Sequence, residues 1–257
     1  MQLRYNMVMS SPQPSTLYFY PTIFERFPEV VAIHSLLDQG QPAGFSMLRG
    51  GSEEELAANR ATLVKAAGFP PNRLAVPKQV HGDTILELSD TYTFESRPEG
   101  DALIADEPGW LIGAAVADCV AVLLYDPAHH AIAAVHSGWR GSAQNIVGKT
   151  VQALNEHYHS ETADLYTFVS PAPAQEEFEV ERTVVSDRFE PKYSTPGASG
   201  KAWFDNKAVV HDQLLDAGIP PNQIEIDPRS TISDPRLHSA RRDGEQSGRM
   251  IVAIGLR

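Results

Sequence analysis

The stretch from Gly113 to Gly141 constrains the fold more than any other part of this sequence. Leu111–Ala117 and Val120–Tyr125 are almost wholly apolar, which is typical of strands covered on both faces. Asp126-Pro127 interrupts the apolar run and predicts a turn, after which Ala131–Val135 is predicted to be the returning strand. We therefore expect a buried strand hairpin at the centre of a mixed α/β fold.

Three polar side chains interrupt this apolar background: Asp118, Cys119 and His136. A polar group that is buried without a partner costs about 1–3 kcal/mol, so each of them needs one. A metal ion would satisfy Cys119 and His136 together. Asp118 would point to the opposite face from Cys119 in a continuous strand, whereas a bulge would bring it to the same site, as a base or as support for a ligand.

A third candidate ligand is His81, which lies between the predicted strands Leu74–Val80 and Thr84–Leu88. With Cys119 and His136 it offers two imidazoles and one thiolate from separate strand ends. Zinc accepts these ligands, and three protein ligands leave a fourth position open, as in catalytic zinc sites. The alternative from the residues alone is a buried free cysteine with two hydrogen-bonded core histidines.

A candidate anion site follows the hairpin, at Gly138-Trp139-Arg140-Gly141. These residues precede a predicted helix that has Ser142 as its N-cap and runs to about Tyr158. Backbone amides at a helix start attract anions, and glycine lets a ligand approach closely. Arg140 can bind a phosphate or carboxylate through two hydrogen bonds. The alternative is a tight turn in which Trp139 packs into the core.

A capping box predicts another helix, because Ser52 is followed three residues later by Glu55, and Gly68 ends it. Arg60 on this helix is a candidate anion-binding residue, although its spacing alone favours a solvated helix charge. Asp205 is expected to cap a helix that ends at Ala217. We expect a loop over 38–51, a flexible turn over 193–200, and further strands at Leu17–Tyr20, Val30–Leu37, Asp101–Ala105, Leu165–Val169, Ile224–Ile226 and Met250–Ile254.

The length of 257 residues fits one large domain or two small ones, and we expect a flexible N-terminus over 1–16 followed by a single domain over 17–257. The net charge of −12 argues against nucleic acid or an anionic membrane as a partner, whereas local arginines can still bind small anions. One cysteine cannot form an intrachain disulfide. The N-terminus lacks the apolar core of a signal peptide, and no apolar run is long enough to span a membrane, so we expect a cytoplasmic protein.

A series of motifs, in order along most of the chain, resembles the YfiH-like family, which is also called the polyphenol oxidase or laccase-domain family. The motifs are Gln79-Val80-His81-Gly82, Asp101-Ala-Leu-Ile-Ala-Asp, Ala117-Asp118-Cys119-Val120, Ala134-Val135-His136-Ser-Gly138-Trp139-Arg140-Gly141, and Arg241-Arg242-Asp243-Gly244 with Gly248-Arg249-Met250. The resemblance implies stacked mixed sheets flanked by helices, similar to the cytotoxic necrotising factor toxins, and a metal site at His81, Cys119 and His136.

Members of this family include bacterial purine nucleoside phosphorylases. The resemblance therefore implies phosphorolysis of adenosine, inosine, guanosine or methylthioadenosine, with adenosine deamination as a side activity. We expect Zn²⁺ as the cofactor, with Cu²⁺ as the alternative ion, and a nucleoside and phosphate as the small-molecule partners. Asp118 and Arg140 are then candidate catalytic residues, and the candidates for binding substrate are Arg60, Gln79, Gly138 and Arg242.

Two other activities remain open. The family was earlier assigned copper-dependent polyphenol oxidation, but this chain has nine histidines and a single His-x-His element, at His157-Tyr-His159, so a multicopper cluster is not expected. Alternatively, Cys119 could be the nucleophile of an amidase or another hydrolase, with His136 as its base. The sequence departs from the family pattern in the segments 34–50, 170–177 and 230–233, and loops near a site usually set its specificity.

Overall fold

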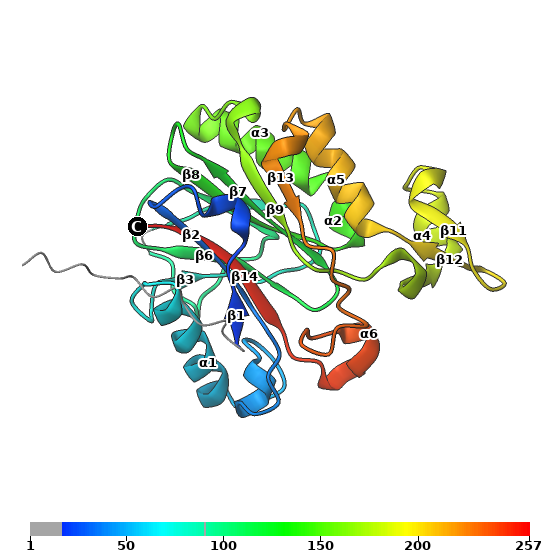
Figure 1. Ribbon diagram of the computed structural model, residues 1–257, viewed down its shortest axis with the longest axis horizontal. Helices are drawn as coiled ribbons and strands as arrows, with labels where there is room; N and C mark the ends of the chain where they lie inside the picture. Colours follow the sequence, from blue (N-terminus) through cyan, green and yellow to red (C-terminus); the bar gives the residue numbers. More distant parts are fainter. Residues whose placement is uncertain (1–16, 90) are drawn as a thin grey trace, which may run out of the picture.

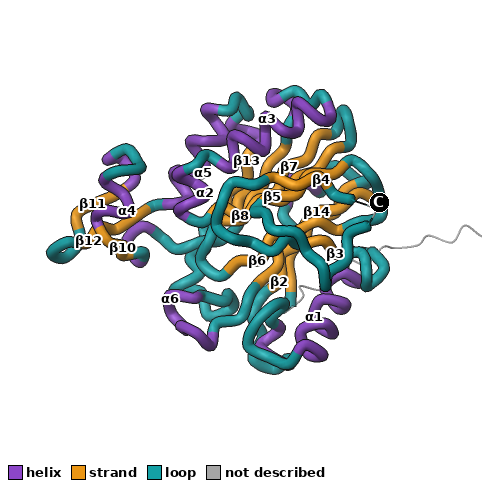
Figure 2. Tube along the Cα trace, turned by 180° about the vertical axis from the view of Figure 1, so that it is seen from behind, coloured by secondary structure: helices purple, strands orange, loops and turns teal. Residues whose placement is uncertain are grey.

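The computed structural model describes residues 17–89 and 91–257, so the expectation of a flexible segment over 1–16 lies outside the described residues. Within them, the strands form a five-stranded, a six-stranded and a three-stranded sheet. The two larger sheets are stacked, and helices cover the outer face of each (Figures 1 and 2). This arrangement confirms the expected fold class, a mixed α/β fold with stacked mixed sheets flanked by helices.

The five-stranded sheet has the strand order β1-β2-β14-β6-β3. The C-terminal strand β14 pairs antiparallel with both β2 and β6, so the end of the chain lies in the middle of this sheet. The strands of this sheet are β1 (Tyr18–Phe19), β2 (Val30–Ser35), β14 (Met250–Leu256), β6 (Leu111–Val116) and β3 (Leu74–Ala75).

The six-stranded sheet has the order β13-β9-β7-β8-β5-β4 and contains the predicted hairpin. Strands β7 and β8 pair antiparallel, and the Asp126 carboxylate accepts hydrogen bonds from the backbone amides of Ala128 and His129, which confirms the turn. The strands are β13 (Ile224–Ile226), β9 (Tyr166–Val169), β7 (Val120–Asp126), β8 (Ala131–Ser137), β5 (Ala102–Ala105) and β4 (Ile85–Glu87).

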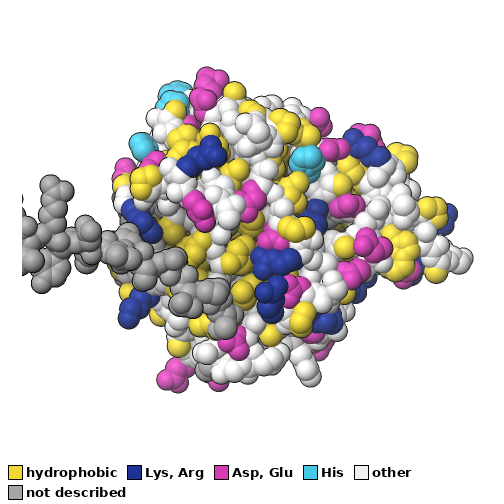
Figure 3. Space-filling view, in the orientation of Figure 1, with side chains coloured by type: hydrophobic (Ala, Val, Ile, Leu, Met, Phe, Trp, Pro, Cys, Tyr) yellow, Lys and Arg dark blue, Asp and Glu magenta, His cyan; other side chains and the backbone are white. Residues whose placement is uncertain are grey.

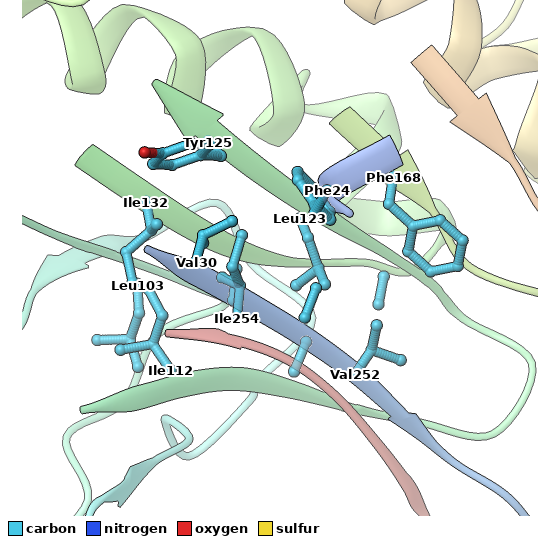
Figure 4. Close-up of a cluster of buried hydrophobic side chains, with 14 of the residues drawn as sticks. Phe24, Val30, Leu103, Ile112, Leu123, Tyr125, Ile132, Phe168, Val252 and Ile254 are labelled. Carbon is cyan, nitrogen blue, oxygen red and sulfur yellow. The ribbon is translucent and has the colours of Figure 1, made fainter. Parts of the chain in front are cut away.

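The main core lies between the two large sheets, where alternate side chains of each sheet meet. In Figure 4, Leu123 and Ile132 of the six-stranded sheet lie near Ile112 and Ile254 of the five-stranded sheet. The remaining side chains of β7 and β8 pack on the opposite side against the helices α3 (Ile146–Tyr158) and α5 (Asn206–Asp216). The hairpin is therefore covered on both faces, as its apolar sequence predicts.

Helix α1 (Glu53–Ala66) covers the outer face of the five-stranded sheet, and the predicted capping box between Ser52 and Glu55 is present. Helix α5 (Asn206–Asp216) is capped by Asp205, also as predicted. The expected helix from Ser142 is wrong in its start. A short helix α2 (Trp139–Ala143) follows Gly138, and α3 (Ile146–Tyr158) begins after it, with Asn145 as the N-cap.

A three-stranded sheet that the sequence does not predict extends from one side of the molecule (Figure 1). It consists of β10 (Glu179–Glu181), β12 (Lys201–Phe204) and β11 (Ser194–Pro196), with the helix α4 (Arg182–Ser186) beside it. The expected flexible turn over 193–200 is therefore corrected to a strand and the turn that follows it. The strands of this three-stranded sheet are three or four residues long, which is too short for an alternating hydrophobic pattern to be recognised.

Several predicted strands are shorter than expected, among them the strands that begin at Val30 and Leu74. The strand from Val30 ends at Ser35, and the strand from Leu74 ends at Ala75. Beyond Ala75, the Gln79 side chain replaces backbone pairing, since its amide donates to the carbonyl of Ala115 and accepts from the backbone N–H of the same residue. In the described residues, no helix combines the length and the apolar character needed to cross a membrane.

Candidate metal centre and its cleft

His81, Cys119 and His136 come together at one place, as the sequence predicts. Their ligand atoms lie within 4.8 Å of one another, and the Cys119 Sγ is 3.8 Å from the His81 Nε2. His81 lies in the turn before β4, Cys119 just before β7, and His136 near the end of β8. Two imidazoles and a thiolate at this spacing, with His81 exposed and His136 buried, fit a zinc ion that keeps one side open.

The Asp101 carboxylate organises two of the three ligands. Its Oδ1 accepts a hydrogen bond from the backbone N–H of His81 (2.9 Å) and lies 2.8 Å from the His136 Nδ1. Its Oδ2 accepts from the backbone N–H of Gly82 at 2.7 Å. A carboxylate behind a histidine fixes the ring orientation and leaves the other nitrogen free for a metal. The sequence analysis did not identify Asp101 as a site residue, although one of the motifs begins with it.

The electrostatics of the trio favour an ionised cysteine. Burial acts to raise the pKa of the Cys119 thiol, but the positive charge of His136 and hydrogen bonds from both histidines lower this pKa to about 6. Burial acts to lower the pKa of His136, but Cys119 and Asp101 raise it to about 9. These opposite shifts favour a thiolate beside an imidazolium when no metal is bound, and the thiolate is the form that binds a metal.

Gly138 is placed against the metal ligands. A Cβ atom at this position would lie 2.9 Å from the His81 Cδ2 and 3.0 Å from the Cys119 Sγ, which is too close for any side chain. The close approach of the backbone at the end of β8 therefore requires glycine at this position. Gly138 shapes the metal centre.

A cleft of about 600 Å³ opens beside the three ligands. Four arginines and a lysine line it, together with Gln79, Asp118 and the apolar side chains of Leu48, Pro77 and Phe178. The lysine, Lys78, pairs with Glu99, whereas the four arginines make no salt bridge with any described carboxylate. They are Arg49, Arg97, Arg241 and Arg249.

This unpaired positive charge is notable in a chain with a net charge of −12. Burial, and then the charge of Arg49, lower the pKa of the Arg249 guanidinium. Four arginines beside a single lining carboxylate, that of Asp118, leave a net positive charge in the cleft, which indicates a place for an anion. On the face seen in Figure 3, by contrast, Lys and Arg side chains are interspersed with Asp and Glu.

Four predicted site residues do not line the cleft, namely Gly138 and three arginines. Arg140 is exposed, and its guanidinium lies over the ring of Trp139, 4.3 Å from the ring centroid. Arg60 is buried, with 8% exposure, and donates to the Met47 carbonyl. It also pairs with Glu53 and lines a separate pocket beneath Phe94.

Arg242 is also used by the protein itself. Its guanidinium donates to the backbone carbonyls of Thr231, Ile232, Asp234 and Leu237, and it pairs with Asp243. Gln79 and Asp118, by contrast, do reach the cleft. The sequence shows no signal for Arg49 and Arg97, and it presents Arg241 and Arg249 only as members of the last family-like motif.

Comparison with known proteins assigns the family. Residues 43–257 match the family described as multi-copper polyphenol oxidoreductase laccase. A protein of Bacteroides thetaiotaomicron named purine nucleoside phosphorylase is 32% identical over 219 residues, which cover 80% of this chain and 81% of the relative. The purine nucleoside phosphorylase YlmD of Geobacillus stearothermophilus is 31% identical over 225 residues, which cover 81% of each chain.

Solved structures of similar proteins have the same fold. The crystal structure of YlmD from Geobacillus stearothermophilus superposes with a TM-score of 0.86 at 28% identity, over 96% of this chain and 98% of that chain. The hypothetical protein YfiH of Bacillus licheniformis has the same fold, with a TM-score of 0.87 at 24% identity over 95% of this chain and 97% of that chain. The chain therefore belongs to the YfiH-like, laccase-domain family, whose curated relatives carry the name purine nucleoside phosphorylase.

Proposed function

We propose that this protein is a zinc-dependent purine nucleoside phosphorylase. The observation that carries the proposal is a His-Cys-His site that opens onto a cleft lined by four arginines, none of which forms a salt bridge with a carboxylate of the described residues. A phosphorylase needs a site for phosphate next to a site for a nucleoside, and the relatives carry this name. We propose adenosine, inosine, guanosine and methylthioadenosine as the nucleosides.

His81, Cys119 and His136 would hold the zinc ion, which when bound supplies a Lewis acid that polarises an oxygen of a substrate. Arg49, Arg241 and Arg249 bind phosphate and take over the anion-binding role that the sequence assigned to Arg140. Guanidinium groups suit this task because they bind phosphate through paired hydrogen bonds. Leu48, Pro77 and Phe178 give the purine an apolar surface.

In the reaction, a phosphate oxygen forms a bond to C1′ of the ribose while the bond between C1′ and the purine nitrogen breaks. The products are the free base, which takes up a proton as it leaves, and ribose 1-phosphate, which is the 5-methylthio derivative when the substrate is methylthioadenosine. The arginines hold phosphate against the ribose and neutralise part of its charge, so that two reactants are held in one orientation.

The test is to incubate the zinc-loaded protein with each nucleoside, with and without phosphate, and to measure ribose 1-phosphate and free base. We expect both products in equal amounts, only when phosphate is present. Arg249→Ala should lower kcat/KM for phosphate by at least about tenfold. Arg140→Ala should stay within about twofold of the unaltered protein, because Arg140 does not line the cleft. No ribose 1-phosphate from any of the nucleosides would refute the proposal.

Adenosine deamination is the side activity that we propose for the same metal site. Zinc centres with an open position support the attack of water on the adenine ring in other deaminases. Inosine and ammonia should form from adenosine in the absence of phosphate. Deamination that persists at full rate in His81→Ala would show that the metal centre does not carry it.

One observation favours a second function, that of a thiol hydrolase. Cys119, His136 and Asp101 form a continuous chain of thiol, imidazole and carboxylate, the arrangement that activates a cysteine nucleophile. In this case zinc should block both the alkylation of Cys119 and the activity, whereas a metal-dependent phosphorylase should need the ion. Copper oxidase activity has less support, since among the described residues these three ligands form the only potential metal cluster.

A further inference from the structure

We propose that Asp118 is a positioning residue that fixes Arg241 at the edge of the cleft, and that it is not the general base of the reaction. The inference rests on the proposed function, because it assumes that Arg241 binds the phosphate. The sequence leaves two roles open for Asp118, a base or a support for a ligand, and the inference selects a supporting role, although a carboxylate next to a metal ligand is the usual candidate for a base.

The backbone at Asp118 is held in an unusual conformation. Asp118 has a φ angle of 90°, in the left-handed region, where β6 ends and β7 has not yet begun. A non-glycine residue in such a region costs on the order of 1–3 kcal/mol and persists only where its surroundings enforce it. As a result, Asp118 and Cys119 both line the cleft, although neighbours in a regular strand would face opposite sides.

Both carboxylate oxygens of Asp118 are engaged with the protein. The hydroxyl of Thr231 donates to Oδ1 at 2.6 Å, and the backbone N–H of Arg241 donates to Oδ2 at 2.7 Å. These partners lie 113 and 123 residues further along the chain. The carboxylate therefore ties the C-terminal segment to the bend between β6 and β7 that carries Cys119, and proton abstraction would compete with these bonds.

Arg241 is the residue that this bond positions. Its Nη1 donates to the Glu179 carbonyl at 2.6 Å, and its guanidinium carbon lies 4.9 Å from the centroid of the Phe178 ring. Arg241 is thus fixed at its backbone by Asp118 and at its side chain by the start of β10. The helix α6 (Ala240–Asp243) has only four residues, so it cannot hold Arg241 in place alone.

Thr231→Val gives the sharpest test, because Thr231 is fully buried, does not line the cleft and touches Asp118 through the hydroxyl that valine lacks. We expect Thr231→Val and Asp118→Asn each to raise KM for phosphate about 5- to 10-fold, which is the size of one typical hydrogen bond, because the loss acts on phosphate only through Arg241. KM for the nucleoside and kcat at saturating phosphate should change by less than about threefold. A general base would behave differently: Asp118→Asn would lower kcat by about 100-fold or more, and Thr231→Val would leave KM for phosphate unchanged.

Thr167→Val in β9 is the matched control. Thr167 is also fully buried, its hydroxyl has no hydrogen-bond partner in the described structure, and it lies outside the cleft. This variant should bind and react like the unaltered protein. It separates the loss of the hydrogen bond between Thr231 and Asp118 from the general effect of replacing a buried threonine by valine.

Calorimetric titration of the zinc-loaded protein with inorganic phosphate separates this inference from the proposed function. If no nucleoside is cleaved but phosphate binds and Thr231→Val weakens it about 5- to 10-fold, the proposed function fails and the inference stands. If nucleosides are cleaved but Thr231→Val and Thr167→Val bind phosphate equally well, the inference fails alone. Phosphate that does not bind the unaltered protein overturns the inference as well.

Discussion

Asp101 connects the turn that carries His81 to the ring of His136, so a change confined to its carboxylate should lower the affinity for the metal. Asp101→Asn keeps the size of the side chain but replaces one oxygen acceptor by an amide donor that faces the same N–H groups. We expect the affinity for zinc to fall about 10- to 100-fold, measured by competition with a chromophoric chelator. The control, Asp83→Asn, loses only a partly exposed pair with Lys149 and should bind zinc normally. Equal affinities would mean that Asp101 does not orient His136.

The thiol of Cys119 gives a second test at this scale. In metal-free protein its pKa is lowered to about 6, so the thiolate should be present above about pH 6 and disappear as the pH falls below it. The rate of alkylation by iodoacetamide should therefore have its midpoint near pH 6, and His136→Ala should move the midpoint upward. A midpoint near the ordinary value of about 8.5 in the unaltered protein would contradict the proposed thiolate–imidazolium pair.

The three candidate metal ligands could be predicted from the sequence, but the arginines that line the cleft could not. A histidine or cysteine in an apolar run is conspicuous, and the motifs around it are specific. An arginine is different, because its long side chain can pair with any partner that the fold supplies. Arg60 forms an ion pair with Glu53, and Arg242 donates hydrogen bonds to backbone carbonyls. Only the tertiary structure shows these partners. For the same reason, the sequence does not show that Arg49 forms no salt bridge with a described carboxylate.

Among the elements, the start of α3 departs most clearly from expectation. An N-cap residue usually has an extended backbone, whereas Asn145 has a φ angle of 57° and its side chain accepts from the N–H of Gly148 at 3.3 Å. Asn145→Ala should lower the free energy of unfolding by about 1–2 kcal/mol, because it loses the cap and is strained at positive φ. Asn145→Gly should lower the free energy of unfolding by less, since glycine adopts this backbone conformation freely. Both are measured by urea denaturation, and an alanine variant as stable as the glycine variant would exclude backbone strain.

Local signals explain which elements could be predicted. The capping box of α1 and the Asp205 cap of α5 depend on residues within one turn of each other, so the sequence displays them. The three-stranded sheet depends on pairing between strands about 20 residues apart, such as Glu179 with Trp203, and no local pattern marks it. Its position matters because Phe178, just before β10, closes one side of the cleft.

For the molecule as a whole, His34 makes stability depend on pH. It is fully buried in β2, its Nε2 has no hydrogen-bond partner in the described structure, and burial lowers its pKa to about 4. In the unfolded chain the His34 imidazole binds a proton below about pH 6.5, whereas in the folded protein it does so only near pH 4. The folded protein should therefore lose stability as the pH falls from about 6.5 towards 4. The loss from this group is limited to about 3 kcal/mol at about 1.4 kcal/mol per pH unit.

Urea denaturation at pH 7, 5.5 and 4.5 checks this prediction. His34→Gln removes the titrating group, so its stability should fall less steeply over this range than that of the unaltered protein. His238, which is also buried with its pKa lowered to about 4, should account for part of the remaining pH dependence. An identical slope for His34→Gln and the unaltered protein would mean that His34 does not contribute to acid sensitivity.

The central claim is that His81, Cys119 and His136 bind a single metal ion which the phosphorylase reaction needs. Its most direct test is an anomalous-difference map, recorded at the zinc absorption edge, from crystals of protein that cleaves nucleosides in the presence of phosphate. We predict one strong peak at about 2.0–2.3 Å from the two imidazole nitrogens and the thiolate sulfur. No peak between these three side chains in protein that is fully active would contradict the account.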